Sequence, residues 1–258
     1  MNYFACQRTI YHSYVWKYSE MTFLTQYIVF IWEIWLNLWY LITMILHDSY
    51  LDNSLFDNLS NREKAVLTSN ASLIKFDQEE MFVKSDSLLL SVYYIYSGVV
   101  KLKDKNNKLF QLLGAEDNIG LLYLFNHDPI YFSAFGIKGT EVIQFEKNVF
   151  KKFVSTNSKF LVDVYNKSAG NSIALTRNML SYKDHKINGA LANFLLHFDE
   201  KDCLHSLTQK EISEILGYSR ENVCKCMNEF IREGIIEYQD ESVKLLNVEA
   251  LQTIKQFG

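Results

Sequence analysis

A short run of polar side chains near the C-terminus has the types needed to read the edges of DNA base pairs. It contains Arg220, Glu221, Asn222 and Lys225. An arginine can donate two hydrogen bonds to O6 and N7 of a guanine, a glutamate can accept one from N4 of a cytosine, and a lysine can reach a guanine or a phosphate. We predict that all four residues contact DNA, with Arg220 as the best candidate for a specific base contact.

Two short helices joined by a tight turn would position this run. Thr208 is a good N-cap for the first helix, and Glu211 three residues later completes a capping box. Gly217 ends that helix, because glycine adopts a left-handed backbone without steric cost. Ser219 caps the second helix, and with Thr208 and Gln209 it is expected to position the DNA backbone. The predicted buried side of the second helix is formed by Val223, Cys226, Met227 and Phe230. This is the helix-turn-helix pattern, whose second helix enters the major groove.

The stretch LTQKEISEILGYSRENVCKCMNEFIREGII (207–236) resembles the C-terminal winged helix of the Crp/Fnr family of bacterial transcription regulators. The residues that match the family signature in register are Leu207, Thr208, Glu211, Ile212, Gly217, Ser219, Arg220, Glu221, Val223, Phe230, Gly234 and Ile236. Lys225 stands where the family usually has an arginine. The resemblance implies a regulator that binds double-stranded DNA as a homodimer at near-palindromic sites, with RNA polymerase as a further partner.

Composition narrows the class of protein. The chain has 258 residues, is 48% hydrophobic and carries a formal net charge of −4, which does not by itself indicate a nucleic-acid binder. One basic face is enough for DNA binding, however. The four cysteines form no disulfide framework, so we expect a reducing, cytoplasmic compartment. No nucleophile, carboxylate pair or metal cluster stands out, so the sequence predicts no enzyme, no metal site and no cofactor.

The cysteines also bear on a metal cofactor. Iron–sulfur members of the family hold their cluster with several N-terminal cysteines, whereas Cys6 is the only N-terminal cysteine here. Cys224 and Cys226 fall inside the second helix of the motif, on opposed faces, where two thiols cannot close a metal site.

The resemblance and the strand pattern together predict an α+β fold. Its parts are an N-terminal antiparallel β-roll of jelly-roll type, a long dimerisation helix and a C-terminal winged helix-turn-helix. The predicted domains are an apolar, aromatic-rich extension (1–46), the β-roll (47–155), the long helix with its hinge (156–183) and the DNA-binding domain (184–258).

The N-terminal extension leaves three interpretations open. Residues 23–46 are long and apolar enough to span a bilayer, but Glu33 lies near the middle at a cost of roughly 2–3 kcal/mol. The segment is therefore a membrane anchor, an amphipathic or partner-binding helix, or no part of the natural protein, whose translation would then begin at Met44. The first interpretation gives the rival function, a membrane-associated sensory protein.

Short apolar runs separated by Asp, Asn and Gly clusters predict the strands of the β-roll. They are residues 72–76, 81–83, 91–96, 99–103, 109–113, 131–137 and 141–146, preceded by a short helix within 55–67. The run YYIYSGVVKL resembles the hairpin of a cyclic-nucleotide-binding domain, centred here on Gly98. NIGLLYLF and YFSAF resemble the start and the end of its phosphate-binding cassette.

The cassette departs from the family at the positions that hold the nucleotide. Cyclic-AMP receptors use a glutamate after the cassette glycine and an arginine before the Ser-Ala pair, whereas this chain has Leu121 after Gly120 and Phe132 before Ser133. A buried phosphate without its cation would be unpaired in low dielectric. The resemblance also places Leu175 and Thr176 against the base. We therefore expect a pocket for an apolar or neutral small-molecule effector, for haem with His127 as a less favoured ligand, or for nothing.

One long helix is predicted to follow the β-roll, with Asn157 as its N-cap. Its apolar and small residues at helical spacing are Leu161, Val164, Tyr165, Ser168, Ala169, Ser172, Leu175, Thr176 and Met179. In the family this helix pairs with its twin, and Val164 and Ser172 are expected to face the partner. The simpler alternative is packing on the helix's own β-roll. Residues near 182–185 would form the hinge, and residues 235–238 and 242–246 a two-stranded wing.

Overall fold

The computed structural model describes Trp32, Leu51 and residues 55–257, apart from His185, Asp202, Ser206, Asp240 and Glu241. Residues 52–258 belong to one compact unit. The predicted anchor at 23–46 lies outside the described residues except for Trp32. Among the residues that are described, no helix is long and apolar enough to cross a membrane.

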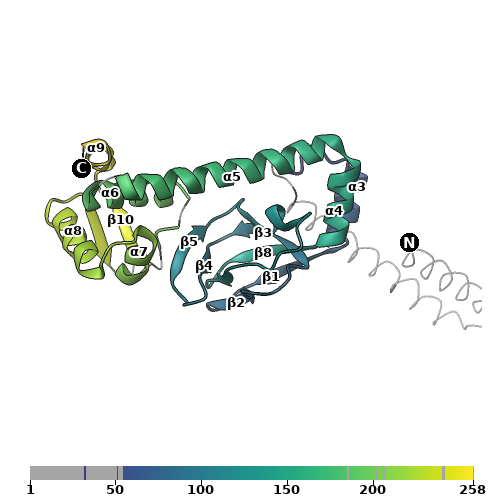
Figure 1. Cartoon of the computed structure of the whole chain (residues 1–258), viewed down its shortest axis with the longest axis horizontal. Helices are drawn as coiled ribbons and strands as arrows, with labels where there is room; N and C mark the ends of the chain where they lie inside the picture. Colours follow the sequence, from purple (N-terminus) through teal and green to yellow (C-terminus); the bar gives the residue numbers. More distant parts are fainter. Residues whose placement is uncertain are drawn as a thin grey trace, which may run out of the picture. The chain divides into compact units, whose positions relative to one another are not determined.

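The β-roll consists of one short helix and two antiparallel sheets (Figure 1). Its elements are α3 (Asn61–Thr68), β1 (Ala71–Lys75), β2 (Glu80–Val83), β3 (Ser91–Ser97), β4 (Val100–Lys103), β5 (Leu109–Leu113), β6 (Asn118–Ile119), the 3₁₀ helix η3 (Leu121–Tyr123), β7 (Ser133–Gly136) and β8 (Glu141–Glu146). One sheet has the order β1-β8-β3-β6 and the other β2-β7-β4-β5. Buried side chains of both sheets, such as Ile95 and Val142 from one and Val100 and Ala134 from the other, share one apolar cluster. The predicted strands and fold class are thus confirmed, whereas β6 was not predicted because two residues carry no periodicity.

Two glycines fix the chain path in the β-roll. Gly98 lies between β3 and β4 with φ of 83°, and a Cβ there would lie 2.6 Å from Cα of Thr140. Gly120 begins η3 with φ of 105°, and a Cβ there would lie 2.8 Å from the Leu89 side chain. Both positions exclude a side chain, because the backbone is left-handed and the space is filled.

Four phenylalanines join the β-roll to the helices that follow it. Phe56, Phe145, Phe150 and Phe160 are all fully buried, and their ring centroids lie 5.4–6.5 Å apart. Phe150 belongs to α4 (Lys147–Thr156) and Phe160 to the first turn of α5 (Ser158–Asp184). This cluster fixes where α5 leaves the β-roll. Asn157 caps α5 as predicted, since its side-chain oxygen accepts hydrogen bonds from the backbone N–H groups of Lys159 and Phe160 at 3.1 Å.

The long helix α5 runs alongside the β-roll (Figure 1), and its residues differ in burial between two faces. The inner face includes the buried Phe160 and Val164 and the lining residues of two cavities described below. The opposite face exposes Val162, Tyr165, Ile173 and Leu180, whose exposed fractions are 54–68%. The expectation that Val164 faces a partner subunit is wrong, because this side chain is 5% exposed within its own chain. Apolar residues recur at helical spacing on both faces of α5, so the spacing alone could not show on which face Val164 lies.

The C-terminal elements form a winged helix. They are α6 (Ile187–Asp199), α7 (Gln209–Leu216), α8 (Arg220–Arg232), β9 (Ile236–Gln239), β10 (Ser242–Leu245) and α9 (Val248–Phe257). Residues of every one of these elements pack into one apolar cluster with the buried Phe194, Phe198 and Phe230. The wing strands pair in register from Ile236↔Leu245 to Gln239↔Ser242, as predicted. Residues 182–184 of the predicted hinge are helical and belong to the last turn of α5, and His185 lies outside the described residues.

Candidate nucleic-acid interface

The first helix of the motif is capped by the predicted pair of residues. The Thr208 hydroxyl accepts a hydrogen bond from the Glu211 backbone N–H at 3.2 Å, and Glu211 Oε2 accepts from the Thr208 backbone N–H at 3.0 Å. The two residues thus satisfy two backbone donors at this helix end, one of them in the first turn. Gln209 follows the cap, half-buried, and its amide oxygen accepts a hydrogen bond from the Cys224 thiol of α8 at 2.8 Å. The capping box therefore starts α7, and the hydrogen bond from the Cys224 thiol ties the first residue of α7 to α8.

The turn between the two helices sets the position of α8. Gly217 is the C-cap of α7 with φ of 75°. The side chain of Ser219 then accepts a hydrogen bond from the Asn222 backbone N–H at 3.3 Å, which starts α8. Below the turn, Val223 and Met227 are fully buried and Cys226 and Phe230 are each 2% exposed. These four apolar anchors fix the rotation of α8 about its own axis.

That rotation determines which side chains of α8 face solvent. Arg220, Glu221, Asn222 and Lys225 are all exposed, at the N-terminal end of the helix. The structure thus brings the predicted base-contacting residues together on one open surface, next to the half-buried Thr208 and Gln209 of α7. A convex helix end that carries cationic and amide groups has the shape and chemistry to enter the major groove.

The thiols of α8 have local partners. The Cys226 thiol donates to the side-chain oxygen of Asn188 at 3.2 Å, and burial, followed by Glu229, raises its pKa to about 12. This thiol is therefore protonated, and its partner on α6 differs from that of Cys224, which bonds to Gln209 of α7. Among the described residues, no group of three or more histidine, cysteine or acidic side chains is placed to hold a metal ion. His127 is exposed in a turn where Asn126 and Asp128 bond to each other.

A cavity of about 210 Å³ lies where the effector pocket was expected. Gly120, Leu121, Phe132 and Leu175 line it, while Ser133 and Thr176 do not. The Ser133 hydroxyl accepts a hydrogen bond from the Ser85 backbone N–H at 3.0 Å. Thr176 lies on the exposed side of α5, and its hydroxyl donates to the Ser172 carbonyl at 2.8 Å.

The polar residues of this cavity were missed by the sequence analysis. They are Gln111, Asn118, Tyr123, Ser168, Asn171 and Ser172, and none of the described lining residues is charged. The side-chain nitrogen of Asn118 is buried and has no hydrogen-bond partner among the described residues. The amide of Asn118, two residues before Gly120, was a signal in the sequence that could have indicated a polar group in this cavity.

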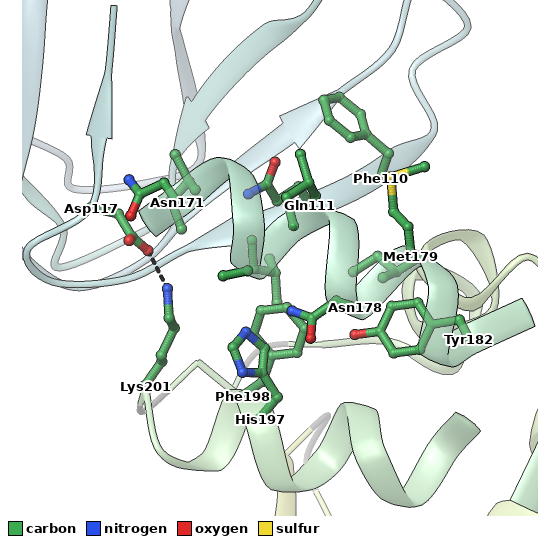
Figure 2. Close-up of a pocket in the computed structure, with 15 residues that line it drawn as sticks. Phe110, Gln111, Asp117, Asn171, Asn178, Met179, Tyr182, His197, Phe198 and Lys201 are labelled. Carbon is green, nitrogen blue, oxygen red and sulfur yellow. Dashed lines mark hydrogen bonds and ion pairs between the residues drawn. The ribbon is translucent and has the colours of Figure 1, made fainter. Parts of the chain in front are cut away.

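A second cavity of about 80 Å³ lies between β5, α5 and α6 (Figure 2). Figure 2 shows Asn178 and Tyr182 of α5 together with His197 of α6 around it, and Lys201 paired with Asp117 at its edge. The Lys201 ammonium lies 2.7 Å from the Asp117 carboxylate. Burial is the main cause that lowers the pKa of His197, with Lys201 as the second, so this imidazole is neutral near pH 7.

A β-roll with an internal cavity, followed by a long helix and a winged helix-turn-helix, is an architecture consistent with a DNA-binding transcription regulator. Residues 189–254 match the family model of the Crp-like helix-turn-helix domain. A CRP-like cAMP-activated global transcriptional regulator of Mycobacterium tuberculosis is 24% identical over 173 residues, which cover 62% of this chain and 77% of that protein.

Solved structures show the same fold. A CRP-family transcriptional regulator from Thermus thermophilus matches with a TM-score of 0.60 and 17% identity, over 72% of this chain and 96% of that one. A putative regulator of the crp/fnr family from Eubacterium rectale matches with a TM-score of 0.63 and 13% identity, over 81% and 99%. The C-terminal region of the chain is thus similar to the Crp-like helix-turn-helix domain, and the chain as a whole shares the fold of CRP-family regulators.

Proposed function

We propose that this regulator binds near-palindromic DNA sites as a homodimer, with α8 in the major groove. The observation that carries the proposal is the capped α7–Gly217–α8 unit, which exposes Arg220, Glu221, Asn222 and Lys225 above four buried anchors. Arg220 contacts a guanine, Glu221 a cytosine, and Asn222 and Lys225 a base or a phosphate. Thr208, Gln209 and Ser219 hold the DNA backbone.

The experiment that tests DNA recognition is selection of binding sites from random duplex DNA with the full chain. A twofold dimer places two recognition helices about one helical turn apart, so the selected sites should contain two inverted half-sites with centres about 10 base pairs apart. Enrichment of single half-sites, or of no motif, contradicts the proposal.

The exposed face of α5 supports the homodimer. Val162, Tyr165, Ile173 and Leu180 lie along one side of the helix, and Ala169 between them is small enough to allow close helix approach. Ile173→Glu should dissociate the dimer at micromolar concentration in analytical ultracentrifugation. Lys167→Glu, a charge change elsewhere on the same helix, is the control. A wild-type monomer that binds a palindrome tightly would refute this assembly.

The effector we propose is an uncharged, largely apolar small molecule. The cavity beside Gly120 combines Leu102, Leu121 and Leu175 with amide and hydroxyl groups, and none of its described lining residues carries a positive charge that could pair with a phosphate. The Mycobacterium tuberculosis relative is described as cAMP-activated. This chain is not expected to respond to cyclic AMP, because Leu121 and Phe132 occupy the positions where cyclic-AMP receptors have a glutamate and an arginine.

The compartment, the domain limits and the further partner are also proposals. The cysteine usage supports a cytoplasmic protein, and RNA polymerase is the further partner that the family resemblance implies. The division at residues 46, 155 and 183 stays a prediction. The rival, a membrane-associated sensory protein, depends on residues 23–46, and fractionation of the natural protein separates the two.

A further inference from the structure

The first helix of the DNA-binding motif is held against the β-roll by two carboxylates. Glu211 Oε1 lies 2.6 Å from the ammonium of Lys101 in β4. Glu214 Oε2 accepts a hydrogen bond from the backbone N–H of Leu109 in β5 at 2.9 Å. The two acidic side chains are 15% and 14% exposed, and that of Lys101 is 7% exposed. Both contacts are therefore mostly removed from water and join segments more than one hundred residues apart.

Apolar residues of the β-roll complete this junction. Val99, Leu109, Leu112 and Ile137 pack into the same cluster as the core of the DNA-binding domain. Asp117 and Lys201 add a third polar link. The described arrangement is therefore a docked one, in which α7 packs on β5 of the β-roll and Lys201, just after α6, pairs with Asp117.

The docked end of α7 is the end that DNA binding needs. Glu211 Oε2 caps the helix through Thr208, while its Oε1 pairs with Lys101, so β4 lies one side chain away from the first turn. Glu79 lies 3.5 Å from the same lysine and brings a second carboxylate. A phosphate at this helix end would meet both carboxylates and the sheet edge. The β-roll and a DNA phosphate thus compete for the same surface.

The chemistry of the contacts allows the junction to open. When α7 leaves, Lys101 keeps Glu79 as a partner and gains water, so no charge is left buried and unpaired. The capping box stays intact, because Glu211 uses its other oxygen for Thr208. The ion pair can therefore open without leaving a buried charge, whereas the Leu109 N–H must then bond to water.

The junction is also imperfectly packed. The hydroxyl of Tyr182, a residue 8% exposed, is buried beside the 80 Å³ cavity and has no hydrogen-bond partner among the described residues (Figure 2). A buried polar group without a partner disfavours the state that buries it. Such a defect lowers the free energy needed to separate the domains, as expected for a contact that is made and broken.

We propose that the Glu211–Lys101 and Glu214–Leu109 contacts form an autoinhibitory latch, which must open before α7 can engage DNA. The inference rests on the proposed DNA-binding function. An effector in the β-roll would act by shifting the equilibrium between docked and open states, because β5 and α5 line both cavities.

Lys101→Met tests the latch without touching α7 or its cap. The control is Lys103→Met, which removes the same charge from the same strand but contacts Glu79 rather than the DNA-binding domain. The probes are a duplex selected as above and a scrambled duplex of equal length, both with the full chain and no added effector. Lys101→Met should bind the selected duplex about 5- to 150-fold more tightly than wild type, the usual range of a coupling between two states. Lys103→Met should bind as wild type does.

A second pair of variants reports docking itself. Glu214→Ala removes the acceptor for the Leu109 N–H, whereas Glu214→Gln keeps an acceptor oxygen there. Hydrogen exchange at the Leu109 amide, measured without DNA, should speed up in Glu214→Ala and Lys101→Met but not in Glu214→Gln. DNA affinity should rise in the same two variants.

The outcomes separate the latch from the proposed function. Faster exchange with unchanged or weaker DNA binding would overturn the latch alone, since the contact would then be structural or would hold the DNA-competent arrangement. Failure of every variant and of wild type to bind either duplex would refute DNA binding, and the latch with it.

Discussion

Replacing Leu121 by glutamate and Phe132 by arginine would put a carboxylate and a cation into the cavity beside Gly120. In wild type, Leu121 is 5% exposed, and the Phe132 ring stands edge to face against Phe110 at 6.0 Å. The wall that would meet a ribose and a phosphate is therefore apolar, and no described lining residue is charged.

The missing groups set the expected affinity for a cyclic nucleotide. Leaving a buried phosphate without its cation costs about 3–5 kcal/mol relative to the paired state. Losing a carboxylate acceptor for the ribose costs about 1.5–3 kcal/mol more. At about 1.4 kcal/mol for each factor of ten, the two losses weaken binding at least roughly 1,000-fold. A site that would be micromolar with both groups becomes millimolar or weaker.

Isothermal titration calorimetry is the assay. Wild type should show no saturable binding of cyclic AMP or cyclic GMP up to about 1 mM, and DNA binding should not respond to either nucleotide. The double variant should recover measurable binding, because Gly120 keeps the cassette backbone in place. The single variant Leu121→Glu, which adds no cation, is the control and should show no measurable binding of either nucleotide. A micromolar isotherm with the unmodified protein would refute the reasoning from charge.

Three further predictions concern stability. Phe160→Ala should lower the free energy of unfolding by about 3–5 kcal/mol in urea denaturation, because the ring is fully buried among Phe56 and Phe150; a loss under 1 kcal/mol would contradict that packing. Thr208→Ala should cost about 1 kcal/mol through loss of the α7 cap, whereas the cost of Thr176→Ala on exposed α5 should be within about 0.5 kcal/mol. Burial is the main cause that lowers the pKa of His197 below 6.5 in the folded protein. As the pH falls, the imidazole is therefore protonated in the unfolded chain before it is protonated in the folded one, and the free energy of unfolding should decrease below pH 6.5. Chemical denaturation of His197→Gln between pH 7 and 5 should show a shallower fall, and an unchanged slope would contradict the assignment.

Local chemistry explains what could be predicted from the sequence. The pair Thr208 and Glu211, the left-handed Gly217 and the cap Ser219 depend on backbone hydrogen bonds within a few residues. The same holds for Asn157 at the start of α5. The strands followed from short apolar runs between turn residues. Such signals need no knowledge of which element packs against which.

Long-range packing explains what could not be predicted. Val164 and Ile173 both belong to apolar repeats of α5, and only the fold shows that the first is buried and the second exposed. Lys101 and Glu211 are 110 positions apart, and no sequence pattern indicates that their side chains meet. The amides Gln111, Asn118 and Asn171 meet in one cavity because three separate elements bring them there.

Arg220→Ala gives the most direct test of the central claim that α8 reads DNA. Quantitative binding to the selected palindrome should weaken by about 1–3 kcal/mol for each half-site, and repeated selection should show relaxed preference at one base pair per half-site. Arg62→Ala, which removes the same charge from the exposed surface of α3, should bind as wild type does. If Arg220→Ala binds the palindrome with the affinity and the base preference of wild type, α8 is not the recognition helix.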